Sequence, residues 1–143
     1  MKEDVSQRTQ SVHKAHKALP LDVERTASSI VDAALAVHRA LGPGLLESVY
    51  ETCLAHELRL RGHEVSEQLA LPVTYNSLTL DAGYRIDLMV DNAVVVEIKA
   101  VAALAELHEA QLLTYLRLSN RRLGLLINFN VVLLKHGIKR KIL

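Results

Sequence analysis

The segment RIDLMVDNAVVVEIK, residues 85–99, decides the fold. Two mostly apolar stretches, residues 84–90 and 93–100, flank Asp91-Asn92, a pair that is typical of a tight turn. The unbroken run Val94-Val95-Val96 is typical of a central strand that is covered on both faces. The sequence therefore predicts two adjacent antiparallel strands in the interior of a sheet.

Two carboxylates interrupt these apolar strands. Asp87 and Glu97 each lie among aliphatic residues, where an ionised group is costly unless it is paired or binds a cation. Carboxylate oxygens suit Mg²⁺ or Mn²⁺, which also recruit phosphate oxygens and activate water for phosphodiester hydrolysis. Lys99 points to the same face as Glu97 and would orient that water or stabilise the transition state. A plain Glu97–Lys99 ion pair on a strand is the alternative.

The length of the strand connection tests the metal-site hypothesis. A two-residue turn would pair Val90 with Ala93 and place Asp87 and Glu97 on opposite faces of the sheet. A three-residue loop or a bulge pairs Val90 with Val94 and sets the two carboxylates opposite one another. The metal site therefore requires the longer connection.

The rest of the chain alternates between helical and strand patterns. Ser28 and Ser29 are candidate N-caps of a first helix, which Gly42-Pro43-Gly44 ends. Val131 to Leu134 is expected to be a short strand near the end of the chain. The other expected elements are a helix over 46–61, a strand over 65–75 that Pro72 places at an edge or a bulge, a strand over 78–80, a helix over 104–120 and strands over 123–128 and 138–143. This order predicts an α/β fold.

Composition limits the function classes. The net charge of +1 says little about partners, and four tyrosines and one phenylalanine are too few for a platform that stacks single strands. We expect residues 1–26 to be a polar N-terminal tail and residues 27–143 to be a single domain. Without a signal peptide or a long apolar run, the chain is expected to be cytoplasmic with no membrane partner.

Several ordered motifs carry a resemblance to a known family. They are GLLESVY at 44–50, YRIDL at 84–88, VEIKA at 96–100, HEAQLLTYL at 108–116 and GLLINF at 124–129. The first motif matches the signature of the GxxExxY protein family, and the resemblance covers residues 28–143. That family resembles the PD-(D/E)XK nuclease superfamily, with Ile86 at the position of the proline that names it.

The resemblance implies both a fold and a set of site residues. The fold is a restriction-endonuclease-like core, a mixed central β-sheet flanked by α-helices. Asp87, Glu97 and Glu47 would bind Mg²⁺ or Mn²⁺, and Lys99 would assist catalysis. Gln111 and Tyr115 match the QxxxY motif of the RecB-like clade, where these residues border the active site. The six catalytic candidates are Glu47, Asp87, Glu97, Lys99, Gln111 and Tyr115.

The expected function is metal-dependent hydrolysis of phosphodiester bonds in DNA or RNA, with DNA as the first expectation. The alternative is a catalytically inactive module that keeps the nuclease fold to bind nucleic acid or a protein, and a homodimer is a further option. Tyr50 is expected to be packed with its hydroxyl bonded. His108 has either a structural role or a role in the site. His56 and His63 are expected to be exposed.

Overall fold

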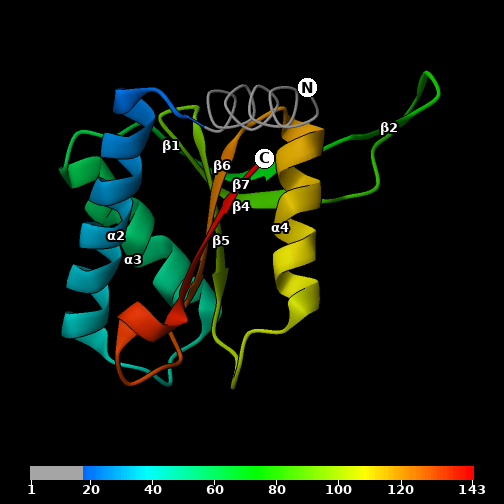
Figure 1. Cartoon of the computed structure of the whole chain (residues 1–143). Coiled ribbons are helices and arrows are strands. Elements are labelled where there is room, and N and C mark those ends of the chain that lie inside the picture. Colours follow the sequence, from blue (N-terminus) through cyan, green and yellow to red (C-terminus); the bar gives the residue numbers. More distant parts are fainter. Residues whose placement is uncertain (1–17) are drawn as a thin grey trace, which may run out of the picture.

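The computed structural model describes residues 18–143 (Figure 1). It contains three α-helices, one short 3-10 helix and seven strands in this part of the chain. Their bounds are α2 Leu21–Leu41, α3 Glu47–Leu60, β1 Val65–Ala70, β2 Val73–Tyr75, β3 Leu78–Leu80, β4 Arg85–Val90, β5 Val94–Lys99, α4 Glu106–Ser119, β6 Leu123–Asn128, η1 Leu134–Gly137 and β7 Ile138–Ile142.

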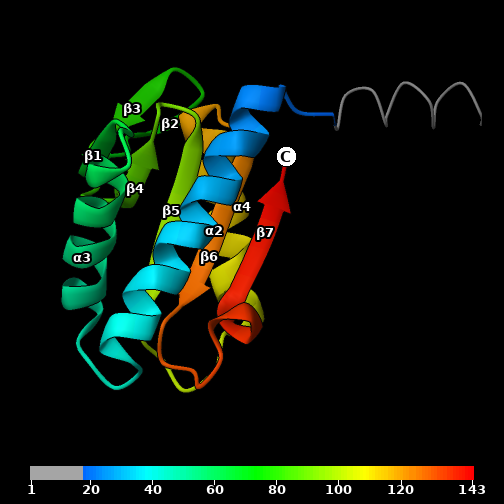
Figure 2. The same ribbon diagram turned by 90° about the vertical axis from the view of Figure 1, so that its left-hand side faces the viewer.

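Five strands form a mixed sheet in the order β1-β4-β5-β6-β7. Strands β5 and β6 are parallel because α4 crosses over between them, and the other neighbours are antiparallel. Helices α2 and α3 cover one face of the sheet and α4 covers the other, as Figures 1 and 2 show from two sides. The predicted mixed sheet flanked by helices is confirmed, and it is consistent with a restriction-endonuclease-like fold.

Each face of the sheet has its own aliphatic core. The larger one lies under α2 and α3, where Tyr50 and Phe129 stack with their ring centroids 4.6 Å apart. The smaller one lies under α4 and includes Leu112, which fits against Gly124 so closely that an added Cβ would lie 2.7 Å from a leucine methyl carbon. Strands β5 and β6 are therefore covered on both sides, as the run of valines predicted.

The β4–β5 connection has the length that the metal-site hypothesis requires. Val90 pairs with Val94, so three residues, 91–93, form the loop. Asp91 and Asn92 adopt left-handed φ values of 53° and 52°, which aspartate and asparagine tolerate better than most residues. The register condition is confirmed, and Asp87 and Glu97 come from facing positions of neighbouring strands.

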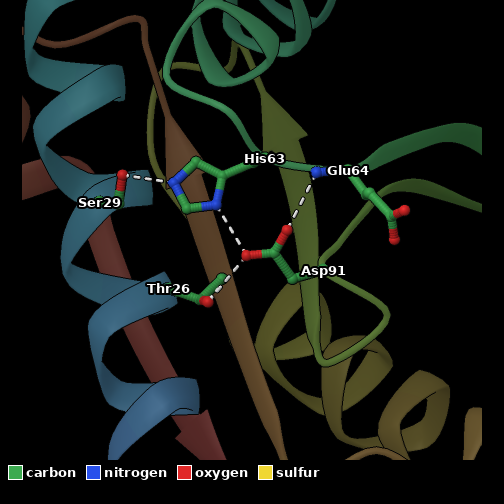
Figure 3. Close-up of polar contacts among 5 residues, drawn as sticks. All are labelled: Thr26, Ser29, His63, Glu64 and Asp91. Carbon is green, nitrogen blue, oxygen red and sulfur yellow. Dashed lines mark hydrogen bonds and ion pairs between the residues drawn. The ribbon is translucent and has the colours of Figure 1, made fainter.

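A polar cluster fixes this loop to the helices (Figure 3). The Asp91 carboxylate accepts hydrogen bonds from the backbone N–H of Glu64 at 3.0 Å and from the Thr26 hydroxyl at 2.9 Å. Its Oδ2 also lies 2.7 Å from His63 Nδ1, and His63 Nε2 lies 2.7 Å from Ser29 Oγ. The expectation that His63 is exposed was wrong, because its ring lies between α2 and the loop with only 16% of the side chain exposed.

The hydrogen-bonded series Ser29–His63–Asp91 has the residue types of a hydrolase triad, but its surroundings indicate a structural role. A carboxylate only accepts, so Nδ1 of His63 donates to Asp91, and in the neutral ring Nε2 accepts from Ser29. Ser29 lies in the middle of α2, where the helix uses the backbone N–H groups that a serine nucleophile would need nearby. The cluster therefore serves to hold the loop that sets the β4–β5 register.

Asp91→Ala is expected to lower the free energy of unfolding by about 2 kcal/mol, because charge-assisted bonds from Glu64 and Thr26 are lost. Partial burial raises the pKa of Asp91, but the hydrogen bonds from His63 and from the Glu64 backbone lower it by more. The pKa of Asp91 is therefore below 3.8. Its stabilising effect is thus present above about pH 3.8 and is lost as the pH falls through the folded-state pKa. Urea unfolding at neutral and acid pH measures both effects. Asp81→Ala, in an exposed loop, is the control, and equal stability of the two variants at neutral pH would contradict the assigned role.

Two expectations for local structure were wrong. Helix α2 begins at Leu21 rather than beside Ser28 or Ser29, because Val23 continues its apolar stripe toward the N-terminus and Pro20 fixes the start. Residues 131–134 do not form a strand; Leu134 instead opens the 3-10 helix η1. Gly137 ends this helix against β6, where an added Cβ would lie 2.2 Å from the Asn128 carbonyl oxygen.

Strands β2 and β3 form a separate hairpin that stands away from the body (Figure 1). Asn76-Ser77 is its turn, as predicted, and both residues have positive φ. The expected long strand divides here, because Pro72 lies between β1 and β2 and cannot donate a ladder hydrogen bond. The helices of residues 18–143 do not combine the length and the hydropathy that a membrane span needs.

Candidate active site

Asp87 and Glu97 lie where β4 and β5 stop pairing through their backbones. The paired positions run from Val90 and Val94 to Leu88 and Val96. Beyond them, the backbone N–H of Asp87 donates to Glu97 Oε2 at 2.9 Å, and the N–H of Ile98 donates to Asp87 Oδ2 at 2.8 Å. Each carboxylate therefore crosses to the other strand, and the two side chains are held beside one another.

Glu97 is buried, with 5% of the residue exposed. Burial is the main cause that raises its pKa, and the negative charge of Asp87 is the second; together they raise the pKa of Glu97 to about 8. The positive charge of Lys99 lowers the pKa of Glu97, but no ion pair joins Lys99 to Glu97 among the described residues. The simple ion-pair alternative therefore finds no support in this part of the chain.

Glu47 reaches the same site from the first turn of α3. Tyr50 fixes this helix start, because its hydroxyl donates to the Gly42 carbonyl at 2.6 Å and accepts from the Leu45 N–H at 3.0 Å. The expectation of a packed, bonded Tyr50 is confirmed. Partial burial of the Glu47 carboxyl raises its pKa, while the charge of Lys99 lowers it and that of Asp87 raises it. Glu47 thus lies within electrostatic range of both strand residues.

Glu51 is a site residue that the sequence reasoning missed. Its carboxylate accepts a hydrogen bond of 2.8 Å from Gln68, whose amide also donates to Asp87 Oδ1 at 3.1 Å. Burial is the largest cause that raises the pKa of Glu51, and the charge of Asp87 adds to it. The spacing from Glu47 was the available signal, since residues four apart share a helix face.

Gln111 and Tyr115 close the site from the opposite face of the sheet, on α4. The Gln111 amide donates to the Tyr115 hydroxyl at 3.2 Å. Burial raises the pKa of Tyr115, and the charges of Glu97 and Asp87 raise it further, which places its hydroxyl near both carboxylates. Tyr84, 47% exposed, packs its ring edge to face on Tyr115 at 6.4 Å.

Asn128 holds the segment that follows Lys99. Its side chain bonds both backbone groups of Val101, accepting at 3.0 Å and donating at 2.9 Å. The Phe129 N–H donates to the Lys99 carbonyl at 2.9 Å. Asn128 is 1% exposed, so these bonds are shielded from water. The end of β5, and with it Lys99, is fixed to β6.

His108 has a clear structural contact. Its Nδ1 accepts from the Ala105 N–H at 3.0 Å and so satisfies a free donor at the start of α4. The same ring affects the pKa of Glu47, so it also lies at the edge of the site. Arg85 is exposed at the start of β4 and forms no ion pair with the described residues.

The donor set fits a divalent cation that water and substrate help to bind. Within residues 18–143, no three His, Cys, Asp or Glu side chains converge closely enough to hold an ion by themselves. Asp87 and Glu97 do form an adjacent pair of hard oxygen donors, held beside one another by the crossed backbone hydrogen bonds. Magnesium sites in phosphate enzymes commonly use one or two carboxylates and complete the shell with waters and phosphate oxygens.

Comparison with known families agrees with this geometry. A family model described as the PD-(D/E)XK nuclease superfamily matches residues 24–141. The chain belongs to this superfamily. The match covers both strands of the carboxylate pair and the helices that carry Glu47 and Gln111, so every candidate site residue lies inside it. No curated protein and no solved structure matched the chain.

Membership gives the site its general chemistry. PD-(D/E)XK nucleases generally use divalent metal ions, and the superfamily implies a nucleic-acid substrate. The superfamily takes its name from a motif with Asp, Asp/Glu and Lys positions. That Asp87, Glu97 and Lys99 occupy these positions stays a prediction from the sequence motifs.

Proposed function

We propose that this protein is a metal-dependent nuclease that hydrolyses phosphodiester bonds, with DNA as the first expected substrate. The observation that carries the proposal is the crossed carboxylate pair of Asp87 and Glu97 with Lys99 two residues on. A buried carboxylate whose pKa is raised to about 8 beside a second carboxylate is typical of an active site and supports the proposal.

Asp87 and Glu97 are the proposed metal ligands, with Glu47 as a further acidic residue at the site. A divalent cation bound there would supply charge to polarise the phosphate and to make water acidic enough to attack it. Lys99 would offset the negative charge that develops on the phosphate oxygens. Tyr115, with Gln111 bonded to its hydroxyl, would border the substrate on the α4 side and donate a hydrogen bond there.

The test is a cleavage panel with single-stranded, duplex and branched DNA, matching RNAs, and Mg²⁺, Mn²⁺ or EDTA. Wild-type protein is expected to cleave at least one substrate only with metal. Lys99→Ala is expected to lower the rate roughly 100-fold or more, as loss of a transition-state contact does. Lys135→Ala, an exposed lysine on η1, is the control and should keep the wild-type rate.

The inactive-module alternative predicts a different result in the same panel. It predicts binding to nucleic acid with no cleavage of any substrate, and an equal affinity for wild type and Lys99→Ala. Calorimetry with Mn²⁺ separates the cases, because a protein that binds the ion and still cleaves nothing would refute the nuclease proposal.

A further inference from the structure

Gln68 occupies a strained position directly opposite Asp87. In the β1–β4 ladder, Glu67 pairs with Leu88 and Leu69 pairs with Ile86, so Gln68 faces Asp87 between them. Its φ is 51°, in the left-handed region that residues with a Cβ adopt at a cost. Within residues 18–143, the other non-glycine residues with such a φ lie in turns or at a helix end. Strain of this kind persists where the surroundings enforce it, and it gathers at functional sites.

The contacts of the Gln68 side chain show what this conformation achieves. Nε2 donates to Glu51 Oε1 on α3 at 2.8 Å and to Asp87 Oδ1 on β4 at 3.1 Å. The orientation of the amide follows from chemistry, because the carbonyl oxygen would repel both carboxylates whereas the NH₂ group has a proton for each. One amide thus links two acidic residues from two separate elements.

Asp87 is consequently held at both oxygens. Oδ2 accepts from the Ile98 N–H at 2.8 Å, and Oδ1 accepts from Gln68. With both contacts the carboxylate has one preferred rotation, and without Gln68 only the bond to β5 remains. Without Gln68, the negative charge of Glu51 would also repel that of Asp87 with no N–H donor between them.

We propose that Gln68 is a positioning residue of the site, which orients Asp87 and holds Glu51 beside it through one side-chain amide. The inference rests on the proposed function, since the orientation of Asp87 matters because Asp87 is a proposed metal ligand. A contact that orients a metal ligand typically changes metal affinity or activity 10- to 100-fold when it is removed.

The experiment compares Gln68→Gly with Gln68→Ala in the full chain. Both variants remove the amide, but glycine accepts the left-handed φ without strain and alanine does not. Both variants should lose stability with these hydrogen bonds, and Gln68→Gly should melt at a higher temperature than Gln68→Ala because it carries no strain at this φ. Hydrogen exchange of the Ile98 amide, measured by NMR in EDTA, reports the Asp87 contact directly and should be about 10-fold faster in both variants. Ser66→Gly, exposed on the same strand, is the control.

Metal binding supplies the second measurement. Mn²⁺ affinity by calorimetry is expected to fall about 10-fold in Gln68→Gly, although its fold is intact. Wild-type Ile98 exchange and wild-type Mn²⁺ affinity in a stable Gln68→Gly variant would overturn the proposal. If the wild type neither binds Mn²⁺ nor cleaves, the proposed nuclease function fails, while the Ile98 exchange rates still decide whether Gln68 orients Asp87.

Discussion

Asp87→Asn is expected to lower metal-dependent cleavage by roughly 10²- to 10³-fold while leaving the fold in place. Asparagine has the shape of aspartate, so its oxygen can still accept from the Ile98 N–H. Its NH₂ group would face the Gln68 amide, donor against donor, which costs a single hydrogen bond. The negative charge at the proposed metal site is the principal loss.

Three measurements on Asp87→Asn separate chemistry from stability. Cleavage rates with Mg²⁺ and Mn²⁺ give the catalytic effect, calorimetry gives metal affinity, and urea unfolding gives the cost to the fold, expected at about 1 kcal/mol. Asp81→Asn, in the exposed loop before β4, is the matched control. Cleavage by Asp87→Asn at a rate close to wild type would remove this residue from the site.

Glu97→Gln is expected to stabilise the metal-free protein at about pH 8, although it removes a proposed catalytic residue. In the folded state the pKa of Glu97 is raised from 4.5 to about 8. Between these values the folded protein holds a proton that the unfolded chain has released. The free energy of unfolding of the wild type therefore falls as the pH rises, by up to about 1.4 kcal/mol for each pH unit.

Glutamine is neutral throughout this range and still accepts the Asp87 N–H through its oxygen. At about pH 8 in EDTA the variant should therefore be more stable than wild type by roughly 2 kcal/mol or more. Near pH 4 the two proteins should be alike. Added Mg²⁺ should stabilise only the wild type at high pH, because binding to the folded state shifts the equilibrium toward it. Parallel pH dependences of unfolding for the two proteins would refute the raised pKa of Glu97. Glu64→Gln is the control, because the Glu64 side chain points away from the Asp91 cluster (Figure 3).

The sequence alone predicts the two central strands of the sheet, because the features that specify these strands are local. Three valines in a row require cover on both faces, and the strand that contains Asp87 had to pair beside them. Periodicity left the length of the loop open, because a two-residue and a three-residue connection both fit Asp91-Asn92. The structure resolves this through contacts of Asp91 with Thr26 and His63, which lie far from it in the sequence.

The missed parts of the site depend on tertiary contacts. Gln68 lies at an even-numbered position of a strand predicted from its apolar odd-numbered residues, and only the ladder places it opposite Asp87. Glu51 falls on the face of α3 that carries Glu47, but an acidic residue on a helix is ordinarily solvated. His63 was misjudged for a similar reason, since no local pattern shows that α2 packs over its ring.

The crossed bonds between Asp87 and Glu97 also constrain how such a protein can evolve. Each carboxylate serves the chemistry through its charge and the sheet through an oxygen that accepts a backbone N–H from the other strand. Amide replacements remove the first role and keep the second, whereas aliphatic replacements would leave buried N–H donors without a partner. A descendant that lost cleavage and kept the fold for binding should therefore carry asparagine or glutamine at these two positions, and a genome survey would recognise it by that signature.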